Sequence, residues 1–312
     1  MRRPLGTASN PAEQALEAAV GQVADWKDCA VEYEPVIGGI SNSNWRAFVS
    51  GHACSYFVKV PGRGTEMFID RDAAHDAGVK AHQAGVGARI VHYLPESGVE
   101  VSEFVDGLRT STNGDFLDRT VRTNAVRALR KFNDGAPLTL RKTVFDMIDE
   151  HIDQALTLGG HFPMDFGWLN ARYREARKAI EASGLDLAPC MNDTLAGNFL
   201  LDQDRNVMLV DFEYASNNDR CAELALWFGE MFFNPTVERE MIEEYFGRVE
   251  EATVARITVC KALVDLKWST WAMVQNKVST LDFDFFKYGA WKHMRARNVM
   301  RDPRWKQWLE AI

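Results

Sequence analysis

The chain has 312 residues, of which 46% are hydrophobic and 26% charged, so it is globular rather than disordered and large enough for two lobes. Its formal charge of -8 argues against nucleic acid as a partner, because phosphate backbones attract basic surfaces. The five cysteines form no C-x-x-C pair, and we find neither a signal peptide nor an apolar run of membrane-spanning length. We therefore expect a soluble, cytoplasmic protein with reduced thiols and no membrane insertion.

The first third of the chain reads as a β-rich region. Turn and cap residues predict helices over residues 11–25 and 70–84. Five strand-like segments lie between turns, at residues 34–37, 45–50, 56–60, 89–94 and 100–105. Helical patterns dominate the rest of the chain. This order predicts an α+β, bilobal fold, with a small β-rich N-lobe over residues 1–106 and a larger, mainly helical C-lobe over 107–312.

The predicted strands of this region carry a glycine-rich turn and a lysine. Residues 38–44 read Gly-Gly-Ile-Ser-Asn-Ser-Asn, and glycines in such a turn let backbone N–H groups approach phosphates. Alone, the segment reads equally well as an ordinary hairpin turn, and Lys59 reads as an edge residue with a solvated head. In sequence, however, Lys59 follows the turn as a kinase lysine follows its phosphate loop. Together they predict a phosphate-binding site that contains Gly39, Ser41, Asn42 and Lys59.

The stretch after residue 190 carries the most informative pattern. Asp193 is followed five positions later by Asn198, and after a short hairpin the second strand ends at Asp211. A tight loop and a hairpin at this spacing deliver three oxygen-bearing side chains to one small volume. Each residue alone is a common turn or cap residue. The joint pattern is typical of phosphoryl transfer, in which one carboxylate deprotonates a hydroxyl while an Asn and a second Asp hold Mg²⁺ against ATP. Glu213 reads either as a hydrogen-bond acceptor near the metal or as part of a structural ion pair.

Aromatic residues gather in the last fifth of the chain. Trp268 and Trp271 share one face of a predicted helix over 262–276, and Tyr288 and Trp291 repeat the spacing on a following helix. Aromatic stripes at helical spacing usually pack in a core, and spacing alone favours that interpretation. An aromatic wall beside a carboxylate is also what a quaternary ammonium needs, because that group has no N–H to donate.

In this order of motifs, from about residue 38 to residue 297, the sequence resembles the choline/ethanolamine kinases, which share the aminoglycoside-phosphotransferase-like and protein-kinase-like fold. The resemblance implies that Asp193 is the base, that Asn198 and Asp211 bind Mg²⁺, and that Lys59 contacts the phosphates of ATP. The segment from Glu103 to Val105 would hold adenine through backbone groups.

The resemblance also implies a substrate. Trp268-x-x-Trp271, followed by Tyr288 and Trp291, is similar to the family's choline-binding aromatic residues. Glu230, in Trp-Phe-Gly-Glu, is similar to the acidic residue that faces the trimethylammonium head. The resemblance thus predicts phosphotransfer from ATP, with Mg²⁺, to choline, ethanolamine or a similar small cationic amine alcohol.

Three positions depart from the family pattern. Met191 stands where a His, two residues before the base, holds the loop by hydrogen bonds that a Met side chain does not make. Ala74 stands where a helix Glu pairs with the lysine, and Asp72 or Asp76 is a candidate substitute. Leu195 stands where eukaryotic members place an amide.

These departures leave three functions open, in descending order. The first is a choline or ethanolamine kinase. The second is a related kinase for another cationic or sulfonium metabolite, or an aminoglycoside phosphotransferase, although multiply charged aminoglycosides call for a carboxylate-lined pocket. The third is a catalytically silent kinase-like protein that binds a quaternary amine or a partner protein. Met191 and Ala74 favour the third function, whereas the intact polar residues oppose it.

Overall fold

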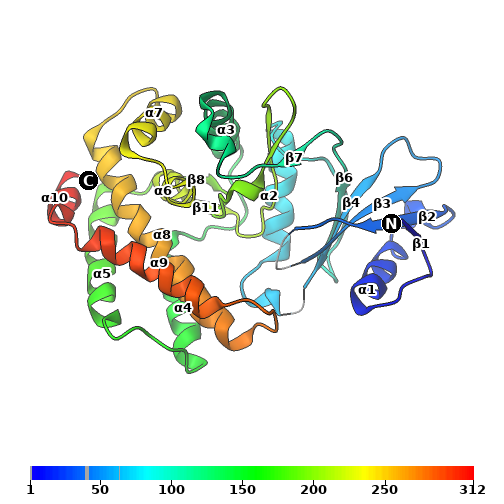
Figure 1. The fold of residues 1–312 in the computed structure, drawn as a ribbon, viewed down its shortest axis with the longest axis horizontal. Helices are drawn as coiled ribbons and strands as arrows, with labels where there is room; N and C mark the ends of the chain where they lie inside the picture. The colour runs from blue at the N-terminus through cyan, green and yellow to red at the C-terminus, as the bar shows by residue number, and fades with distance from the viewer. Residues whose placement is uncertain (1, 39–41, 63) are drawn as a thin grey trace.

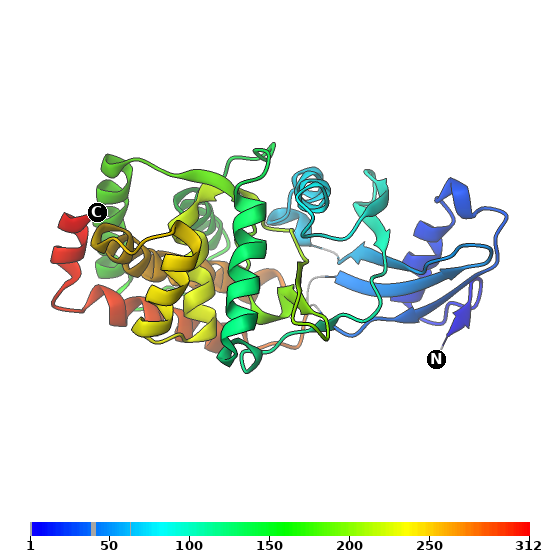
Figure 2. The same cartoon turned by 90° about the horizontal axis from the view of Figure 1, so that it is seen from above.

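The computed structural model describes residues 2–38, 42–62 and 64–312, with the sheet at one end of the molecule and most helices at the other (Figure 1). The N-terminal part builds one antiparallel sheet of six strands in the order β1-β2-β3-β4-β6-β5. These strands are β1 (Arg3–Pro4), β2 (Val31–Pro35), β3 (Asn42–Val49), β4 (Tyr56–Pro61), β5 (Ile90–Leu94) and β6 (Val99–Glu103). In the turned view, the sheet and the C-terminal helices lie at opposite ends of the long axis (Figure 2).

Helix α1 (Pro11–Val20) covers one face of the sheet. Its residue Leu16 packs in one apolar cluster with Val58 and Val60 of β4. Because side chains alternate along a strand, Lys59 lies on the opposite face. The helix ends at Val20, earlier than predicted, and the chain continues through a short 3-10 turn, η1 (Ala24–Trp26).

Helix α2 (Arg71–Gln83) packs beside β5. Its first turn is capped by Asp70, whose side chain accepts a hydrogen bond from the N–H of Ala73 at 3.0 Å. Within the helix, a Cβ added to Gly78 would lie 2.7 Å from Cδ1 of Ile90, so the end of the Ile90 side chain would have to move to admit a larger residue. The predicted helix over residues 70–84 is confirmed to within one residue at each end.

The C-terminal part is mainly helical. Its helices are α3 (Arg119–Asn133), α4 (Val144–Thr157), α5 (Phe166–Ser183), α6 (Arg220–Met231), α7 (Pro235–Phe246), α8 (Glu251–Val278), α9 (Phe285–Met300) and α10 (Trp305–Ala311). Short strands form two small sheets, one of β7 (Arg109–Thr110), β9 (Phe199–Leu201) and β10 (Val207–Leu209), and one of β8 (Leu187–Cys190) and β11 (Ser216–Asp219). Three further 3-10 turns are η2 (Thr65–Met67), η3 (Asp115–Leu117) and η4 (Ala196–Asn198).

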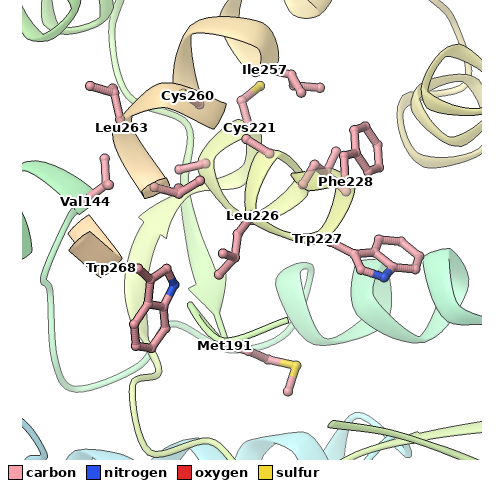
Figure 3. Packing of buried hydrophobic residues seen from close by; sticks show 14 of the residues in the cluster. Val144, Met191, Cys221, Leu226, Trp227, Phe228, Ile257, Cys260, Leu263 and Trp268 are labelled. Carbon is pink, nitrogen blue, oxygen red and sulfur yellow. The ribbon is translucent and has the colours of Figure 1, made fainter. Parts of the chain in front are cut away.

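The long helix α8 forms the centre of the C-terminal core. It contacts α4, α6 and α9. It begins at Glu251, well before the predicted residue 262, and its first turns were not predicted because a helix that is buried on several sides has no single apolar stripe. Met191 is fully buried in the same apolar cluster as Leu226 and Trp268, all three of which Figure 3 labels. This core fixes the segment that precedes Asp193.

The predicted α+β arrangement, with the sheet before the helices, is confirmed. The boundary between residues 106 and 107 stays a prediction. In the part of the chain that the structure describes, no helix combines the length and apolarity needed to cross a bilayer.

Candidate active site

The loop that carries Asp193 follows β8 and is held by its neighbour Asn192. The backbone of Asn192 has a φ of 58°, in the left-handed region that Asn tolerates better than most residues. Its side-chain Nδ2 donates to Ser216 Oγ at 2.8 Å and to the carbonyl of Tyr214 at 2.9 Å, and its Oδ1 accepts from Asn218 at 2.7 Å. The sharp turn is therefore tied to β11 and to the segment just before it.

Asp193 and Asn198 lie together, as predicted. Nδ2 of Asn198 donates to the Asp193 carbonyl at 2.7 Å and to Oδ2 of its carboxylate at 3.3 Å. The other carboxylate oxygen, Oδ1, is buried and has no hydrogen-bond partner. Since an unpaired buried acceptor is costly, Oδ1 is suited to accept the hydroxyl proton of a bound alcohol.

Asp211 is brought to the same place by the β9–β10 hairpin. The N–H of Val210 donates to the carbonyl of Asn198 at 3.0 Å. This backbone bond holds Asp211, the residue after Val210, close to Asn198, so the two predicted metal ligands are neighbours. The backbone of Asp211 has a φ of 68°. The negative charge of Asp211 helps to raise the pKa of Asp193, since like charges disfavour ionisation of a nearby carboxyl. The predicted convergence of Asp193, Asn198 and Asp211 is thus present in the structure.

Lys59 reaches this group from β4. Its Nζ lies 2.7 Å from Asp211 Oδ1 and 3.0 Å from Glu213 Oε1. Burial disfavours the ammonium, but these two carboxylates outweigh it and raise the pKa of Lys59. Glu213 also accepts from Asn42 Nδ2 at 2.8 Å and from Arg71 Nη1 at 2.9 Å. Burial acts to raise the pKa of Glu213, but Lys59 and Arg71 prevail and lower it.

Glu213 therefore supplies to Lys59 the carboxylate partner that was expected from α2. Of the two candidate substitutes for the residue at Ala74, Asp72 accepts from the Tyr93 hydroxyl at 2.7 Å and Asp76 pairs with Lys80 at 2.8 Å. Neither forms an ion pair with Lys59 among the described residues, so that expectation was wrong. Both carboxylates are therefore used in contacts away from Lys59.

The oxygen donors around Asp211 fit Mg²⁺. Nδ2 of Asn198 is directed to Asp193, which leaves Oδ1 of the same amide as an acceptor. Together with the Asp211 carboxylate this gives two hard oxygen donors, the kind that Mg²⁺ takes with its remaining positions filled by water and phosphate. No cluster of three or more His, Cys, Asp or Glu able to hold a metal occurs within residues 2–38, 42–62 and 64–312.

Two buried charged residues that sequence reasoning missed hold the Asp193 loop. Glu223 of α6 accepts from the N–H groups of Met191 at 2.8 Å and Asn192 at 2.9 Å. Lys267 of α8 donates to the carbonyl of Asn192 at 3.1 Å. These bonds support the loop through its backbone, so it does not need a hydrogen-bonding side chain at Met191. A charged residue inside an apolar helical run was the available signal for both, with Asp265 as a second such residue two positions before Lys267.

Burial shifts the acid–base behaviour of these groups. It raises the pKa of Asp193 from 3.8 to about 7, with a further contribution from Asp211 and an opposing one from Lys267. It lowers the pKa of Lys267, against the opposing effect of the Asp193 carboxylate. Burial also raises the pKa of Glu223 to about 7, against its two backbone hydrogen bonds. Perturbed pKa values of this kind gather at functional sites.

Three of the four predicted aromatic residues form one cluster. The ring centroids of Trp268 and Trp271 lie 5.3 Å apart, and those of Trp271 and Tyr288 lie 6.1 Å apart. Tyr214, three residues after Asp211, lies 5.3 Å from Trp268 and joins the cluster to the metal-binding segment. Trp291 is 58% exposed and carries Lys287 over its ring at 4.9 Å, so the structure does not bring it into this cluster.

Glu230 lies at the end of α6 and is already paired. Its Oε1 contacts Lys292 Nζ and lies 3.4 Å from Arg295 Nη1. Arg295 also bonds Asp265 at 2.9 Å, and Lys292 lies 3.8 Å from the same carboxylate. Two carboxylates and two cations thus form one network, which meets the aromatic cluster where Lys292 Nζ lies 5.3 Å from the ring centroid of Tyr288.

The predicted nucleotide contacts are placed only in part. Gly39 and Ser41 lie outside the described residues. Asn42 begins β3 and bonds Glu213, and the N–H of Glu103 is used by the carbonyl of Arg89 at 2.8 Å. The N–H of Val105 has no hydrogen-bond acceptor within the described residues.

Comparisons with known proteins show the family of the chain. The family model described as choline/ethanolamine kinase matches residues 33–246. A probable ethanolamine kinase of Arabidopsis thaliana is 25% identical over 295 residues, which cover 84% of this chain and 77% of the relative. A choline/ethanolamine kinase family protein from Mesorhizobium loti superposes with a TM-score of 0.80 at 27% identity, over 94% of this chain and 96% of that chain. Choline kinase LicA from Streptococcus pneumoniae shares the fold, with a TM-score of 0.75, 20% identity and coverage of 92% and 98%. The predicted protein-kinase-like fold is confirmed.

Proposed function

Since the chain belongs to the choline/ethanolamine kinase family, enzymes that phosphorylate an alcohol, we propose that it transfers the γ-phosphoryl group of ATP to choline or ethanolamine. The observation that carries this proposal is the convergence of Asp193, Asn198 and Asp211 beside Lys59. Such a set of groups has a specific use in phosphoryl transfer and little use in a protein that only binds an amine.

Asp193 acts as the base in this proposal. The hydroxyl of the bound alcohol donates to its unpartnered Oδ1, which orients the oxygen toward the phosphoryl group and takes the proton late in the reaction. Asn198 holds the carboxylate in place through Oδ2. Because phosphoryl transfer is largely dissociative, most of the rate enhancement comes from this positioning.

The nucleotide lies on the β4 side of the site. Lys59 contacts its phosphates, together with Asn42, and the backbone from Glu103 to Val105 holds adenine. The predicted phosphate contacts Gly39 and Ser41 lie outside the described residues. Asn198 and Asp211 hold Mg²⁺, which supplies neutralisation of the charge on the phosphoryl oxygens. Arg71 holds the Glu213 carboxylate, and Glu213 in turn holds the ammonium of Lys59 beside Asp211.

The acceptor lies on the α8–α9 side. Trp268, Trp271 and Tyr288 form the aromatic wall against its amine, with Glu230 as the outer member of the binding set. Trp291, which is exposed and outside this cluster, is not part of the proposed wall. Aromatic faces attract a cation most strongly when water is excluded, and the first two rings are both buried.

A coupled ADP-release assay tests this function. With ATP and Mg²⁺, we expect turnover with at least one of choline, ethanolamine and their methylated intermediates, and a background without acceptor at least tenfold lower. No ADP release with any of these acceptors, with ligand-induced shifts of the melting temperature still present, would contradict the kinase activity and indicate a protein that only binds its ligand.

A further inference from the structure

The segment just before α2 places one of its side chains in the core of the C-terminal part. Phe68 follows the 3-10 turn η2 and is buried. Its ring packs in the cluster built mainly from the C-terminal helices, and not in the cluster of the sheet and α1. The centroid of this ring lies 6.3 Å from that of Trp271 and 5.9 Å from that of His151. A residue of the sheet-bearing part therefore contacts the aromatic wall proposed for the acceptor.

The surface on which Phe68 rests is itself fixed by hydrogen bonds. Nδ1 of His151, on α4, lies 3.2 Å from the carbonyl of Lys267, which stands one turn before Trp271 on α8. Burial, with the positive charge of Lys267, lowers the pKa of His151 to about 3, so the ring is neutral and its Nδ1 donates to this carbonyl. The contact between Phe68 and Trp271 thus lies on a side of α8 that is tied to α4.

The same segment also reaches the proposed phosphate-binding residues. Arg71, three positions after Phe68, begins α2, and its Nη1 donates to Glu213 Oε1 at 2.9 Å. The same carboxylate oxygen lies 3.0 Å from Nζ of Lys59. One short stretch of chain therefore contacts Trp271 on the acceptor side and, through Glu213, the lysine on the nucleotide side.

This stretch is tied together internally. The N–H groups of Phe68 and Ile69 donate to the Thr65 carbonyl at 3.1 and 3.0 Å. The guanidinium of Arg71 contacts the hydroxyl of Thr65, and the Asp70 side chain caps the first turn of α2. A shift of Arg71 is therefore carried to Phe68, because rigid, hydrogen-bonded elements transmit coupling between sites.

We propose that Phe68 is a positioning residue of the acceptor site, which holds the Trp271 ring and makes acceptor binding depend on the bound nucleotide. This inference rests on the proposed function and adds to it a link between the two substrates. When phosphates take the ammonium of Lys59, Glu213 retains Arg71 as its cation, and this pair holds the segment against Trp271. By linkage, a bound acceptor then strengthens nucleotide binding by the same factor.

Calorimetry with and without a non-hydrolysable ATP analogue and Mg²⁺ tests this dependence. For the wild type we expect whichever of choline and ethanolamine binds more tightly to gain at least fivefold in affinity when the nucleotide is present. Phe68→Leu removes the ring yet keeps an apolar side chain, and its gain should fall below twofold, with nucleotide affinity alone within about twofold of wild type. Phe48→Leu, whose ring lies under the guanidinium of Arg2 at 3.5 Å, is the matched control and should keep the gain.

A double-mutant cycle tests whether Phe68 acts through Trp271. Alone, Phe68→Leu should raise the KM for the acceptor at least fivefold and the KM for ATP less than twofold. Combined with Trp271→Ala, the same change should raise the acceptor KM by less than twofold further, because the ring that Phe68 holds is gone. Arg71→Met leaves Phe68 in place and cuts the tie to Glu213, so it should reduce the nucleotide-induced gain as Phe68→Leu does.

Three results would overturn the proposal: a wild-type gain in Phe68→Leu, additive effects of the two changes in the cycle, or equal rises of both KM values, which lost packing alone would produce. The readouts also separate this proposal from the proposed function. Coupled binding without ADP release would contradict only the kinase activity. Turnover by a wild type whose acceptor affinity ignores the nucleotide would contradict only the role of Phe68.

Discussion

Lys59 and Asp211 form an ion pair of 2.7 Å that connects strand β4 of the sheet to the end of the β9–β10 hairpin. The residue proposed to contact phosphate and the residue proposed to hold Mg²⁺ therefore neutralise each other's charge. Glu213 shares the same ammonium at 3.0 Å. Binding of Mg²⁺ with ATP would exchange this pairing, because the phosphates offer Lys59 another anion and the metal offers Asp211 another cation.

The substitution Lys59→Met tests this exchange. Without the ammonium, Asp211 and Glu213 lose their partner, so we expect Mn²⁺, as a probe for Mg²⁺, to bind the nucleotide-free variant at least tenfold more tightly. The KM for ATP should rise at least tenfold in the same variant. Electron paramagnetic resonance titration of Mn²⁺ measures the first effect. Lys80→Met removes a lysine that pairs with Asp76 on α2 and serves as the control. Unchanged Mn²⁺ affinity in Lys59→Met would separate Asp211 from the metal.

The substitution Trp271→Ala tests the aromatic wall. It removes a ring that contacts Trp268, Phe285 and Tyr288, so the KM for the acceptor should rise at least tenfold while the KM for ATP stays within about threefold. The same change at Trp291, which is largely exposed, should alter neither constant by more than about twofold. Equal effects of Trp271→Ala on acceptor and ATP would assign this ring to the core alone.

The substitution Glu223→Gln tests the backbone support of the loop. An amide has one acceptor oxygen and directs an NH₂ group at the second backbone N–H, so the variant should lose about 1–3 kcal/mol of unfolding free energy. Its kcat should fall more than its KM for ATP rises. Urea unfolding measured alongside steady-state kinetics would reveal both effects. A variant with wild-type stability and kcat would mean that Met191 and Asn192 are held without these bonds.

Glu223 also makes stability depend on pH in a defined direction. Its pKa is raised from 4.5 to about 7 in the folded state, so between these values the folded protein holds a proton that the unfolded chain releases. The contribution of Glu223 to stability therefore falls as pH rises through this window. The unfolding free energy of the wild type, relative to Glu223→Gln, should decrease from pH 5 to pH 8. An increase over this range would contradict the raised pKa.

The activity should also depend on pH through Asp193. Its pKa of about 7 in the free protein predicts that kcat/KM rises with pH up to this value and levels above it, because the base must be ionised. Lys267 lowers the pKa of Asp193, so Lys267→Met should move this limb to higher pH. A shift to lower pH in that variant would be opposite to the electrostatic expectation.

The sequence predicted the local parts of the site well. Alternation along β4 placed Lys59 on a strand, and the spacing of Asp193, Asn198 and Asp211 predicted their convergence because a loop and one hairpin determine it. No sequence pattern of this kind predicts contacts between segments that lie far apart in the chain. Glu213 meets Lys59, and Lys267 meets the Asn192 carbonyl 75 positions away, only through the packing of separate elements.

The substrate side was predicted least completely for the same reason. Helical spacing put Trp268 and Trp271 on one face, and the structure joins both to Tyr288. The spacing does not reveal that Lys292 turns toward Glu230 from a helix about 60 residues later, since that contact depends on how α9 crosses α8 (Figure 1). Exposure of Trp291 likewise follows from the rotation of α9, which a pattern of i, i+3 positions leaves undetermined.

The most direct measurement of the central claim is ³¹P NMR of a reaction with ATP, Mg²⁺ and an acceptor found by the ADP-release assay. The wild type should convert the γ-phosphate into a phosphomonoester in proportion to the ADP formed. Asp193→Asn should bind nucleotide with unchanged affinity yet form this product at least a hundredfold more slowly, whereas Asp204→Asn, on the exposed turn of the β9–β10 hairpin, should match the wild type. Comparable product formation by Asp193→Asn, or inorganic phosphate in place of the phosphomonoester, would contradict the account.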